Sequence, residues 1–508
     1  MEKRAQFGTR AGFILAAVGS AIGLGNIWRF PAVAYENGGG AFFIPYLFAL
    51  LTAGIPLLVL EFTIGHKYRG SAPLSFFRMN KKTEWLGWWQ VLVSFVISTY
   101  YAVIIAWAMA YSVFAFNQSW GSDTEGFLFG EYLKLSVDPG QTGSIVAGVF
   151  IPLLLVWIIT LGVLFKGVKK GIEVANKIFI PALVVLFLII VVRALTLPGA
   201  LDGLDAFFAP DFSKIMSPDV WVAAYGQIFF SLSIAFAIMI TYSSYLPKKS
   251  DITNNAFITG FSNSGFELLA GIGVFAALGF MAQTQGVGVE EVVSGGVGLA
   301  FVVFPQIINE FPALNGLFGF LFFASLVLAG LSSLISITET YVAGISEKFG
   351  ITRTKAVAFG GGLSALVSLL FATQGGLLFL DVADYFINQF GVAFIGLVEV
   401  IVVVWFLRKL NTFKGHANGL SDIQLGGWWK VCLGVITPVV LGWMMFGLFK
   451  MNILKEFETE TGNYGGYSDS FILYSGWFVA AFALIVGVAF TFKRWHSKTE
   501  AESYKEVS

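Results

Sequence analysis

Apolar runs of about 20 residues recur along nearly the whole of this chain, and they restrict what it can fold into. A helix of that length crosses a hydrocarbon core of about 30 Å, and its backbone polar groups are satisfied internally. Charged residues make up only 12% of the 508 residues, whereas soluble domains carry about 25%. We therefore predict an all-α polytopic membrane protein. Its twelve expected spans are 11–34, 40–66, 86–116, 144–165, 172–195, 220–246, 253–281, 313–346, 355–373, 377–407, 428–449 and 470–492.

Basic residues are distributed unevenly between the loops. Loops after even-numbered spans are basic, for example at Lys67 and Arg69, whereas loops after odd-numbered spans are acidic or neutral, for example at Asp202. Because basic loops stay on the cytoplasmic side, both termini are expected there, and an even number of spans agrees. The first apolar run lacks the pattern of a cleaved signal peptide and is expected to be a retained span. The predicted location is the cytoplasmic membrane.

Several functional classes lack their characteristic residues. The single cysteine, Cys432, lies in an expected span, so neither an intrachain disulfide nor a thiolate metal cluster is expected. The sequence contains no HExxH, GxSxG or P-loop motif, so we predict neither an enzyme nor an organic cofactor. The formal net charge is zero, which gives no reason to expect a nucleic-acid partner.

The first expected span carries an unusual number of polar and small residues. It contains GSAIGLGNIWRFP, Gly19 to Pro31, with Asn26 and Arg29 inside the apolar run. Unpaired backbone groups in lipid cost several kcal/mol each unless protein, water or ions satisfy them. The glycines alone would also fit a seam of close helix packing. An arginine in a span, however, usually marks a pathway or a charge pair, so we interpret the stretch as an interrupted helix beside a polar site.

The sixth expected span shows a comparable interruption. It reads GQIFFSLSIAFAIMITYSSY, Gly226 to Tyr245, with Ser231 and Ser233 in the middle of an apolar run. The first and sixth spans hold corresponding places in two halves of five spans each. Matching interruptions in two halves indicate an inverted repeat with a binding site near the membrane midplane.

These residues resemble the signature of the neurotransmitter:sodium symporters, and among them the bacterial amino-acid transporters. The resemblance rests on GSAIGLGNIWRFP and ENGGGAFFIPY, and continues through STYYA, FFSLS, SNSGFE, AGLSS and DVAD. It implies a LeuT-like fold with a 5+5 inverted repeat and unwound first and sixth helices, an architecture best known from this family itself. The implied organisation is a cytoplasmic segment 1–10, repeats 11–195 and 220–407, an extracellular lid loop at about 282–312, two further spans within 428–492, and a cytoplasmic tail 493–508.

The resemblance also implies two sodium sites. The first would use Ala21, Asn26, Ser231 and Asn263, together with the substrate carboxylate. The second would use Gly19, Ile22, Ala329, Ser332 and Ser333, where relatives often have threonine in place of Ser332. Neutral carbonyl, amide and hydroxyl oxygens suit a small hard cation. Ser332 and Ser333 could alternatively bond back to their own helix.

The implied substrate is a small neutral amino acid in a pocket between the broken helices. Its carboxylate would meet the backbone amides near Leu24 and Gly25 and the Tyr101 hydroxyl. Gly23 stands where amine-transporting relatives carry aspartate, which favours a substrate that brings its own carboxylate. The implied lining residues are Ser20, Ala21, Gly23, Leu24, Gly25, Ile97, Tyr101, Phe230, Ser231, Ser233, Phe236, Ser333 and Ile337.

Charged residues would supply gates and a fixed anion. Arg29 and Asp384 would form the outer gate, and Arg4 and Glu347 the cytoplasmic latch, with Phe7 packed beside it. Glu267 stands where chloride-dependent animal members bind chloride, so its carboxylate would replace that ion.

Two residues depart from the family pattern. Ala235 and Ala237 stand where the family commonly has glycine, which favours a smaller substrate. The prediction is a sodium-coupled, chloride-independent symporter that imports a neutral amino acid by alternating access with two sodium ions. A transporter for an osmolyte or another carboxylate-bearing molecule, and a non-transporting ligand sensor on the same scaffold, remain alternatives. The oligomeric state stays open.

Overall fold

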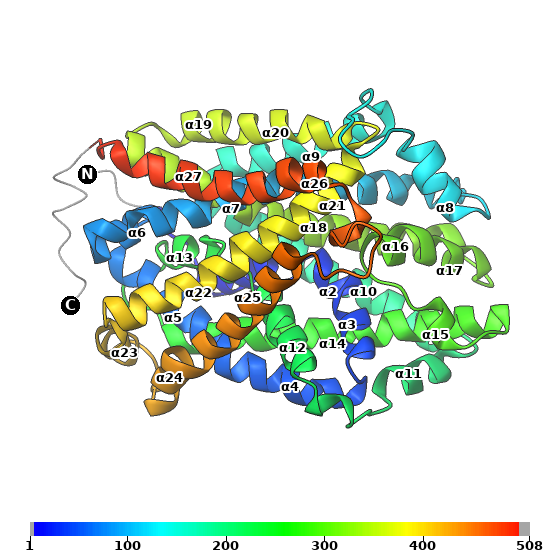
Figure 1. Cartoon of the computed structure of the whole chain (residues 1–508), viewed down its shortest axis with the longest axis horizontal. Coiled ribbons are helices and arrows are strands. Elements are labelled where there is room, and N and C mark those ends of the chain that lie inside the picture. Colours follow the sequence, from blue (N-terminus) through cyan, green and yellow to red (C-terminus); the bar gives the residue numbers. More distant parts are fainter. Residues whose placement is uncertain (1–4, 497–508) are drawn as a thin grey trace.

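The computed structural model describes residues 5–496, and these residues fold into a bundle of helices (Figure 1). No strand forms within this range; two isolated bridges, Gly39 with Pro210 and Ile145 with Thr373, join loop segments. The predicted all-α class is confirmed.

Ten continuous helical segments are long and apolar enough to cross a membrane. Three of them are single α-helices throughout: α9 (Ala147–Phe165), α14 (Ile252–Gln285) and α18 (Asn315–Phe349). Two begin with a short stretch of another helix type: Lys81–Phe114, which contains α7 (Glu84–Phe114), and Val168–Leu195, which contains α10 (Glu173–Leu195). The other five contain two α-helices each: Gly40–Tyr68 with α4 (Phe43–Ala49) and α5 (Ile55–Tyr68), Arg353–Ala372 with α19 (Arg353–Ala356) and α20 (Gly362–Ser368), Gly376–Phe406 with α21 (Gly376–Phe386) and α22 (Phe394–Val400), Gly427–Leu454 with α24 (Gly427–Val431) and α25 (Thr437–Leu454), and Asp469–Phe492 with α26 (Asp469–Ile472) and α27 (Phe478–Phe492).

The two remaining expected spans are broken helices. The first consists of α1 (Arg10–Ala21), α2 (Leu24–Trp28) and α3 (Phe30–Glu36), with a bend of 57° after Ala21. The sixth consists of α12 (Pro218–Ser231) and α13 (Ile238–Ser243), separated by six residues that are not helical. The structure thus confirms a LeuT-like polytopic fold with interrupted first and sixth helices.

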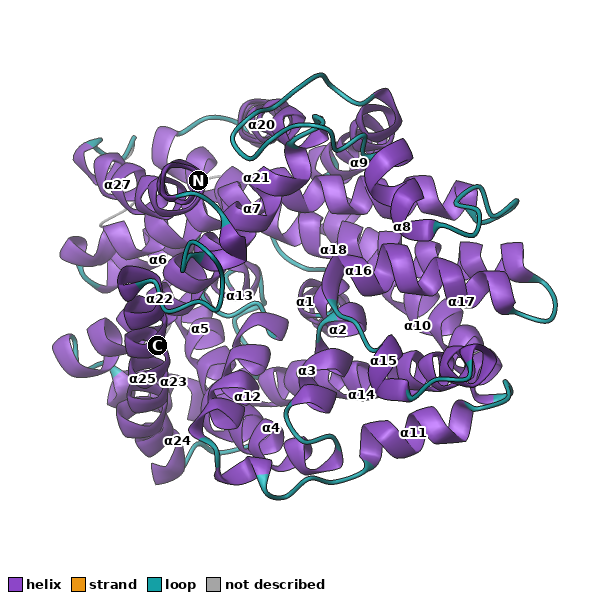
Figure 2. Cartoon of the chain, turned by 45° about the vertical axis from the view of Figure 1, so that its right-hand side comes forward, coloured by secondary structure: helices purple, strands orange, loops and turns teal. Residues whose placement is uncertain are grey.

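The broken helices lie inside the bundle rather than on its surface. Figure 2 shows α1 and α2 near the centre, surrounded by α5, α10, α14 and α18. In the apolar stretch of α7, 89% of the residues are buried inside the protein, against 33% in α9 and in α10. The less buried α9 and α10 can be apolar on all sides, because one side contacts lipid and the other contacts protein. The central helices contact only protein and carry the polar residues.

Shorter helices connect the spans. They are α6 (Ala72–Met79), α8 (Thr124–Gly126), α11 (Ala200–Phe208), α15 (Val289–Val292), α16 (Gly296–Gly298), α17 (Phe304–Glu310) and α23 (Leu410–Asn418). The segment expected to be a lid loop therefore has its own secondary structure in α15 to α17. It begins later than expected, because α14 continues to Gln285.

Candidate functional site

Gly23 separates the two halves of the first broken helix. It has an extended backbone, and its N–H donates to Oδ1 of Asn26 across 2.9 Å, so the asparagine caps the start of α2. A methyl group at Gly23 would lie 3.0 Å from the Tyr101 hydroxyl and 3.3 Å from Oγ of Ser333. The Tyr101 hydroxyl also accepts from the Leu24 amide across 3.3 Å. The absence of a side chain at Gly23 thus leaves a small space bordered by the hydroxyls of Tyr101 and Ser333.

The C-terminal end of α1 faces two serines of α18. Oγ of Ser332 donates to the Gly19 carbonyl across 2.8 Å, and Oγ of Ser333 lies 3.4 Å from both the Gly19 and the Ile22 carbonyls. Ser332 also donates to Ala329 of its own helix across 2.8 Å. The structure therefore brings all five residues expected at the second sodium site into one cluster of oxygen atoms.

A second group of polar side chains links α2, α12 and α14. Nδ2 of Asn26 donates to Oδ1 of Asn263 across 2.8 Å, and Nδ2 of Asn263 donates to Oγ of Ser231 across 3.0 Å. All three side chains are buried. These are three of the four residues expected at the first sodium site; the fourth, Ala21, ends α1 a few residues before Asn26.

A cavity of about 520 Å³ opens beside both clusters. Its lining includes every residue expected to contact the substrate: Ser20, Ala21, Gly23, Leu24, Gly25, Ile97, Tyr101, Phe230, Ser231, Ser233, Phe236, Ser333 and Ile337. A cavity of this size, mostly apolar and with a few convergent polar groups, is typical of a small-molecule site.

The interruption of the sixth span has a strained backbone. Ser233, Ala235 and Ala237 have φ values of +52°, +66° and +61°, in the left-handed region that favours glycine. Oε1 of buried Glu61 accepts from the Ala235 amide across 2.7 Å and satisfies one donor of the unwound segment. Neither alanine lines the cavity. Their methyl groups therefore act on the backbone, and the cavity lining gives no support to the expectation that these alanines favour a smaller substrate.

The cavity lining includes the residues expected to form the outer gate. Arg29 and Asp384 both line it, but no ion pair joins them; the Arg29 guanidinium lies 4.8 Å from the centre of the Phe230 ring. Asp384 instead accepts from Nδ2 of Asn388 across 2.8 Å. The structure thus places both residues at one opening of the cavity and leaves that opening without an Arg29–Asp384 ion pair.

Two loop tyrosines cover one side of this opening. The hydroxyls of Tyr464 and Tyr467 each donate to the Asp381 carboxylate across 2.9 Å. Asp381 and Tyr467 line the cavity. Burial, and next the negative charge of Asp381, raise the pKa of the Tyr467 hydroxyl above its usual value.

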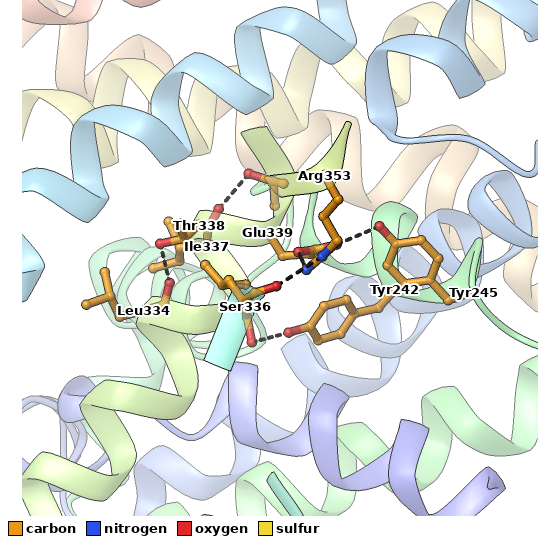
Figure 3. A network of polar contacts seen from close by, with 10 residues as sticks. Tyr242, Tyr245, Leu334, Ser336, Ile337, Thr338, Glu339 and Arg353 are labelled. Carbon is orange, nitrogen blue, oxygen red and sulfur yellow. Dashed lines mark hydrogen bonds and ion pairs between the residues drawn. The ribbon is translucent and has the colours of Figure 1, made fainter. Parts of the chain in front are cut away.

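A separate network of polar contacts links the end of α13 to α18 and α19 (Figure 3). Arg353 donates to both oxygens of the buried Glu339 carboxylate across 2.7 and 2.6 Å, and the Tyr245 hydroxyl donates to Glu339 across 2.7 Å. The Tyr242 hydroxyl donates to Ser336 across 2.8 Å. The network connects α13, α18 and α19.

The N-terminal segment packs against the same end. Phe7 is buried among Phe13, Tyr242 and Tyr245, and its amide donates to the Tyr245 carbonyl across 3.1 Å. The expected latch partner Glu347 accepts from the amide and hydroxyl of Ser71 across 2.9 and 2.6 Å. Arg4, its expected partner, lies outside the described residues.

Glu267 is buried between two donors. Nε2 of Gln227 donates to its Oε1 across 2.7 Å, and the Tyr46 hydroxyl donates to its Oε2. The carboxylate therefore occupies a position where hydrogen-bond donors point at a negative charge, as they would at a bound anion.

Several polar residues near the site were not predicted from the sequence. Glu61, Gln227 and Glu339 are buried and hydrogen-bonded to the interrupted sixth helix or its neighbours. Glu173 of α10 binds the amide of Gly8 across 2.5 Å and the hydroxyl of Thr9 across 2.8 Å. An acidic or amide side chain within an apolar run is the signal that could have revealed them.

Fold and site together define a class: a membrane transporter whose two broken helices surround a mostly apolar cavity with a few polar groups. Residues 4–128 and 118–497 match the family described as the Sodium:neurotransmitter symporter family, and the chain belongs to that family. An uncharacterized sodium-dependent transporter of Methanocaldococcus jannaschii is 43% identical over 96% of each chain. The human sodium- and chloride-dependent taurine transporter is 31% identical over 88% of this chain and 78% of its own length. The human sodium- and chloride-dependent GABA transporter 2 is 30% identical over 96% of this chain and 87% of its own length.

Proposed function

We propose that this member of the family imports a small neutral amino acid together with two sodium ions across the cytoplasmic membrane, with both termini in the cytoplasm. The observation that carries the proposal is the cavity between the broken helices, which combines the backbone amides at the start of α2 with two clusters of neutral oxygen atoms. A carboxylate suits the start of a helix, and neutral oxygens suit sodium.

The absence of an acidic residue at Gly23 supports a substrate with its own carboxylate. Only the Tyr101 and Ser333 hydroxyls approach the position that a side chain would occupy there. The substrate carboxylate would meet the Leu24 and Gly25 amides and complete the first sodium site beside Asn26. Ser231 and Asn263 would supply the remaining ligands of this sodium ion. Ile97, Phe236 and Ile337 would surround the substrate side chain.

Coupling follows from the same geometry. Sodium at either cluster orders unwound backbone that also contacts the substrate, so each ligand stabilises the state that the other needs. Two sodium ions moving with a zwitterion carry two charges, which contributes about 4.6 kcal/mol at about 100 mV.

Access would alternate between the two ends of the cavity. Arg29 and Asp384 would close the outer opening over Phe230. The Glu339–Arg353 network and the buried Phe7 would separate on the cytoplasmic side. The repeats 11–195 and 220–407 would supply the two groups of helices that move.

Glu267 supports transport without chloride. Its ionised carboxylate would accept from Gln227 and Tyr46 and would supply a negative charge there without a bound chloride ion.

The test is uptake of labelled amino acids into proteoliposomes, with an inward sodium gradient, a potassium control and a clamped potential. The panel includes small and large neutral amino acids and also taurine and GABA, because relatives carry those names. Accumulation of a neutral amino acid with sodium, but without chloride, is expected. Sodium-dependent binding without accumulation would instead favour a sensor, and accumulation of taurine or GABA alone would exclude the neutral amino acid.

A further inference from the structure

Asn176 of α10 holds a buried oxygen that no described residue uses. Its side chain is completely buried, and Oδ1 accepts no hydrogen bond from residues 5–496. Nδ2 donates to the Ile172 carbonyl across 2.9 Å, which fixes which end of the amide is the oxygen. An unsatisfied buried acceptor is costly, so such an atom in a folded protein calls for a partner.

The free oxygen lies beside Gly19. A methyl group on Gly19 would lie 2.4 Å from Oδ1 of Asn176 and 2.8 Å from Cδ1 of Ile180. The Gly19 carbonyl is the atom that both Ser332 and Ser333 approach. Oδ1 of Asn176 is therefore adjacent to the proposed second sodium site without being one of its expected ligands.

The position of Asn176 along α10 shows that it lies between the proposed second sodium site and the N-terminal end of α1. Glu173 contacts Thr9 at the start of α1, and Ile180 contacts Gly19 near its end, so α1 and α10 run side by side in the same direction. Asn176 lies between these two contacts. The helices α1, α10 and α18 pack against one another around this point.

Oxygen atoms thus continue from the second site toward the N-terminal end of α1. Beyond the Gly19 carbonyl comes Oδ1 of Asn176, and one turn earlier on α10 comes the Glu173 carboxylate, which also holds the N-terminal segment through Gly8 and Thr9. An amide oxygen is a hard ligand that suits sodium. A path for a cation through a protein interior needs such oxygens at intervals to replace lost water.

Building on the proposed function, we infer that Oδ1 of Asn176 is a transient sodium ligand on the route from the second site to the cytoplasm. When Phe7 and the N-terminal segment move away, the sodium ion passes from the Gly19 carbonyl to Oδ1 of Asn176 and then to the Glu173 carboxylate. The absence of a side chain at Gly19 lets Oδ1 of Asn176 lie this close to the backbone of α1.

The experiment compares two modes of transport in proteoliposomes. Net uptake into a sodium-free interior requires sodium release, whereas exchange with saturating sodium on both sides does not. Asn176→Ala is expected to lower net uptake about tenfold relative to exchange, since a ligand bond to a charged group has roughly that effect. The external sodium concentration for half-maximal substrate binding should stay unchanged.

A second variant tests the same inference in the opposite sense. Asn176→Asp keeps the oxygen and adds a charge, so internal sodium should inhibit net uptake at a concentration about tenfold lower than in the wild type. This readout applies even if the alanine variant fails to fold. An unchanged inhibition by internal sodium would overturn the inference.

Ile180→Val is the matched control, because it changes the packing against the same face of Gly19 without changing an oxygen. It should keep the wild-type ratio of net uptake to exchange. The inference is wrong if Asn176→Ala keeps that ratio, or if Ile180→Val loses it equally. Failure of the proposed function is recognised separately, because the wild type itself would then show no sodium-dependent uptake.

Discussion

Asn26 and Asn263 join two helices that are distant in sequence: Nδ2 of Asn26 in α2 donates to Oδ1 of Asn263 in α14 across 2.8 Å. Asn26 also accepts from the Gly23 amide, so one side chain connects the helix break to the body of the bundle. A sodium ion at this place would draw the same amide oxygens toward itself.

The first prediction concerns this pair. Asn263→Ala removes an amide oxygen from the proposed first site and should raise the sodium concentration for half-maximal substrate binding tenfold or more, since hydrogen bonds to charged groups contribute about 1.5–3 kcal/mol. Scintillation proximity binding in a sodium titration measures it. Asn315→Ala, where the side chain binds carbonyls at the C-terminal end of α17 away from the cavity, is the control and should keep the wild-type midpoint. Equal sodium midpoints in the wild type, Asn263→Ala and Asn315→Ala would contradict the assignment of Asn263 to the first sodium site.

The second prediction distinguishes the effect of the Ser332 hydroxyl on sodium binding from the effect of side-chain size at that position. Ser332→Thr keeps a hydroxyl near the Gly19 carbonyl and should retain sodium-driven uptake within about threefold, whereas Ser332→Ala should lose tenfold or more in sodium affinity. Sodium-dependent uptake of the substrate found in the panel is the measurement. If alanine performs as well as threonine, the hydroxyl is not a sodium ligand.

The third prediction concerns Glu267. Glu267→Ser removes the fixed charge but leaves the donors of Gln227 and Tyr46 in place. Uptake by this variant should require chloride, while the wild type transports equally in chloride and gluconate. Gln227→Ala, which removes a donor but keeps the carboxylate, should remain chloride-independent. A wild type that needs external chloride would refute the role given to Glu267.

The fourth prediction concerns the strained backbone of the sixth span. Ala235→Gly removes a Cβ at φ +66° and should stabilise the protein by about 1 kcal/mol, because left-handed backbone costs other residues about that much. Ala224→Gly, within the regular helix α12, should destabilise it by about 1 kcal/mol. Thermal unfolding in detergent compares the two. Shifts of the same sign would show that strain at Ala235 is relieved elsewhere.

The fifth prediction concerns pH. The raised pKa values of Tyr464 and Tyr467 mean that their contribution to stability is complete below the unfolded value of about 10 and is lost as pH rises toward the folded value. The double variant Tyr464→Phe and Tyr467→Phe lacks this contribution. The difference in unfolding temperature between wild type and variant should therefore be constant from pH 7 to about 9 and shrink above about 10. A difference that grows with pH would contradict it.

The sequence by itself determined the class of fold, because apolar runs of about 20 residues leave a chain few alternatives in lipid. It also located both helix interruptions, since Gly23 and the serines 231 and 233 are costly in a regular span unless polar partners meet them.

Only the tertiary structure decided which distant groups meet there. Three such arrangements depend on how α5, α10 and α21 pack around the broken helices. Glu61 accepts from the Ala235 amide, Arg29 forms no ion pair with Asp384, and the unpaired oxygen of Asn176 lies beside Gly19. Periodicity reports which residues are apolar, but helix packing in a membrane is set by close contact of side chains from different helices, and a single sequence does not contain those distances.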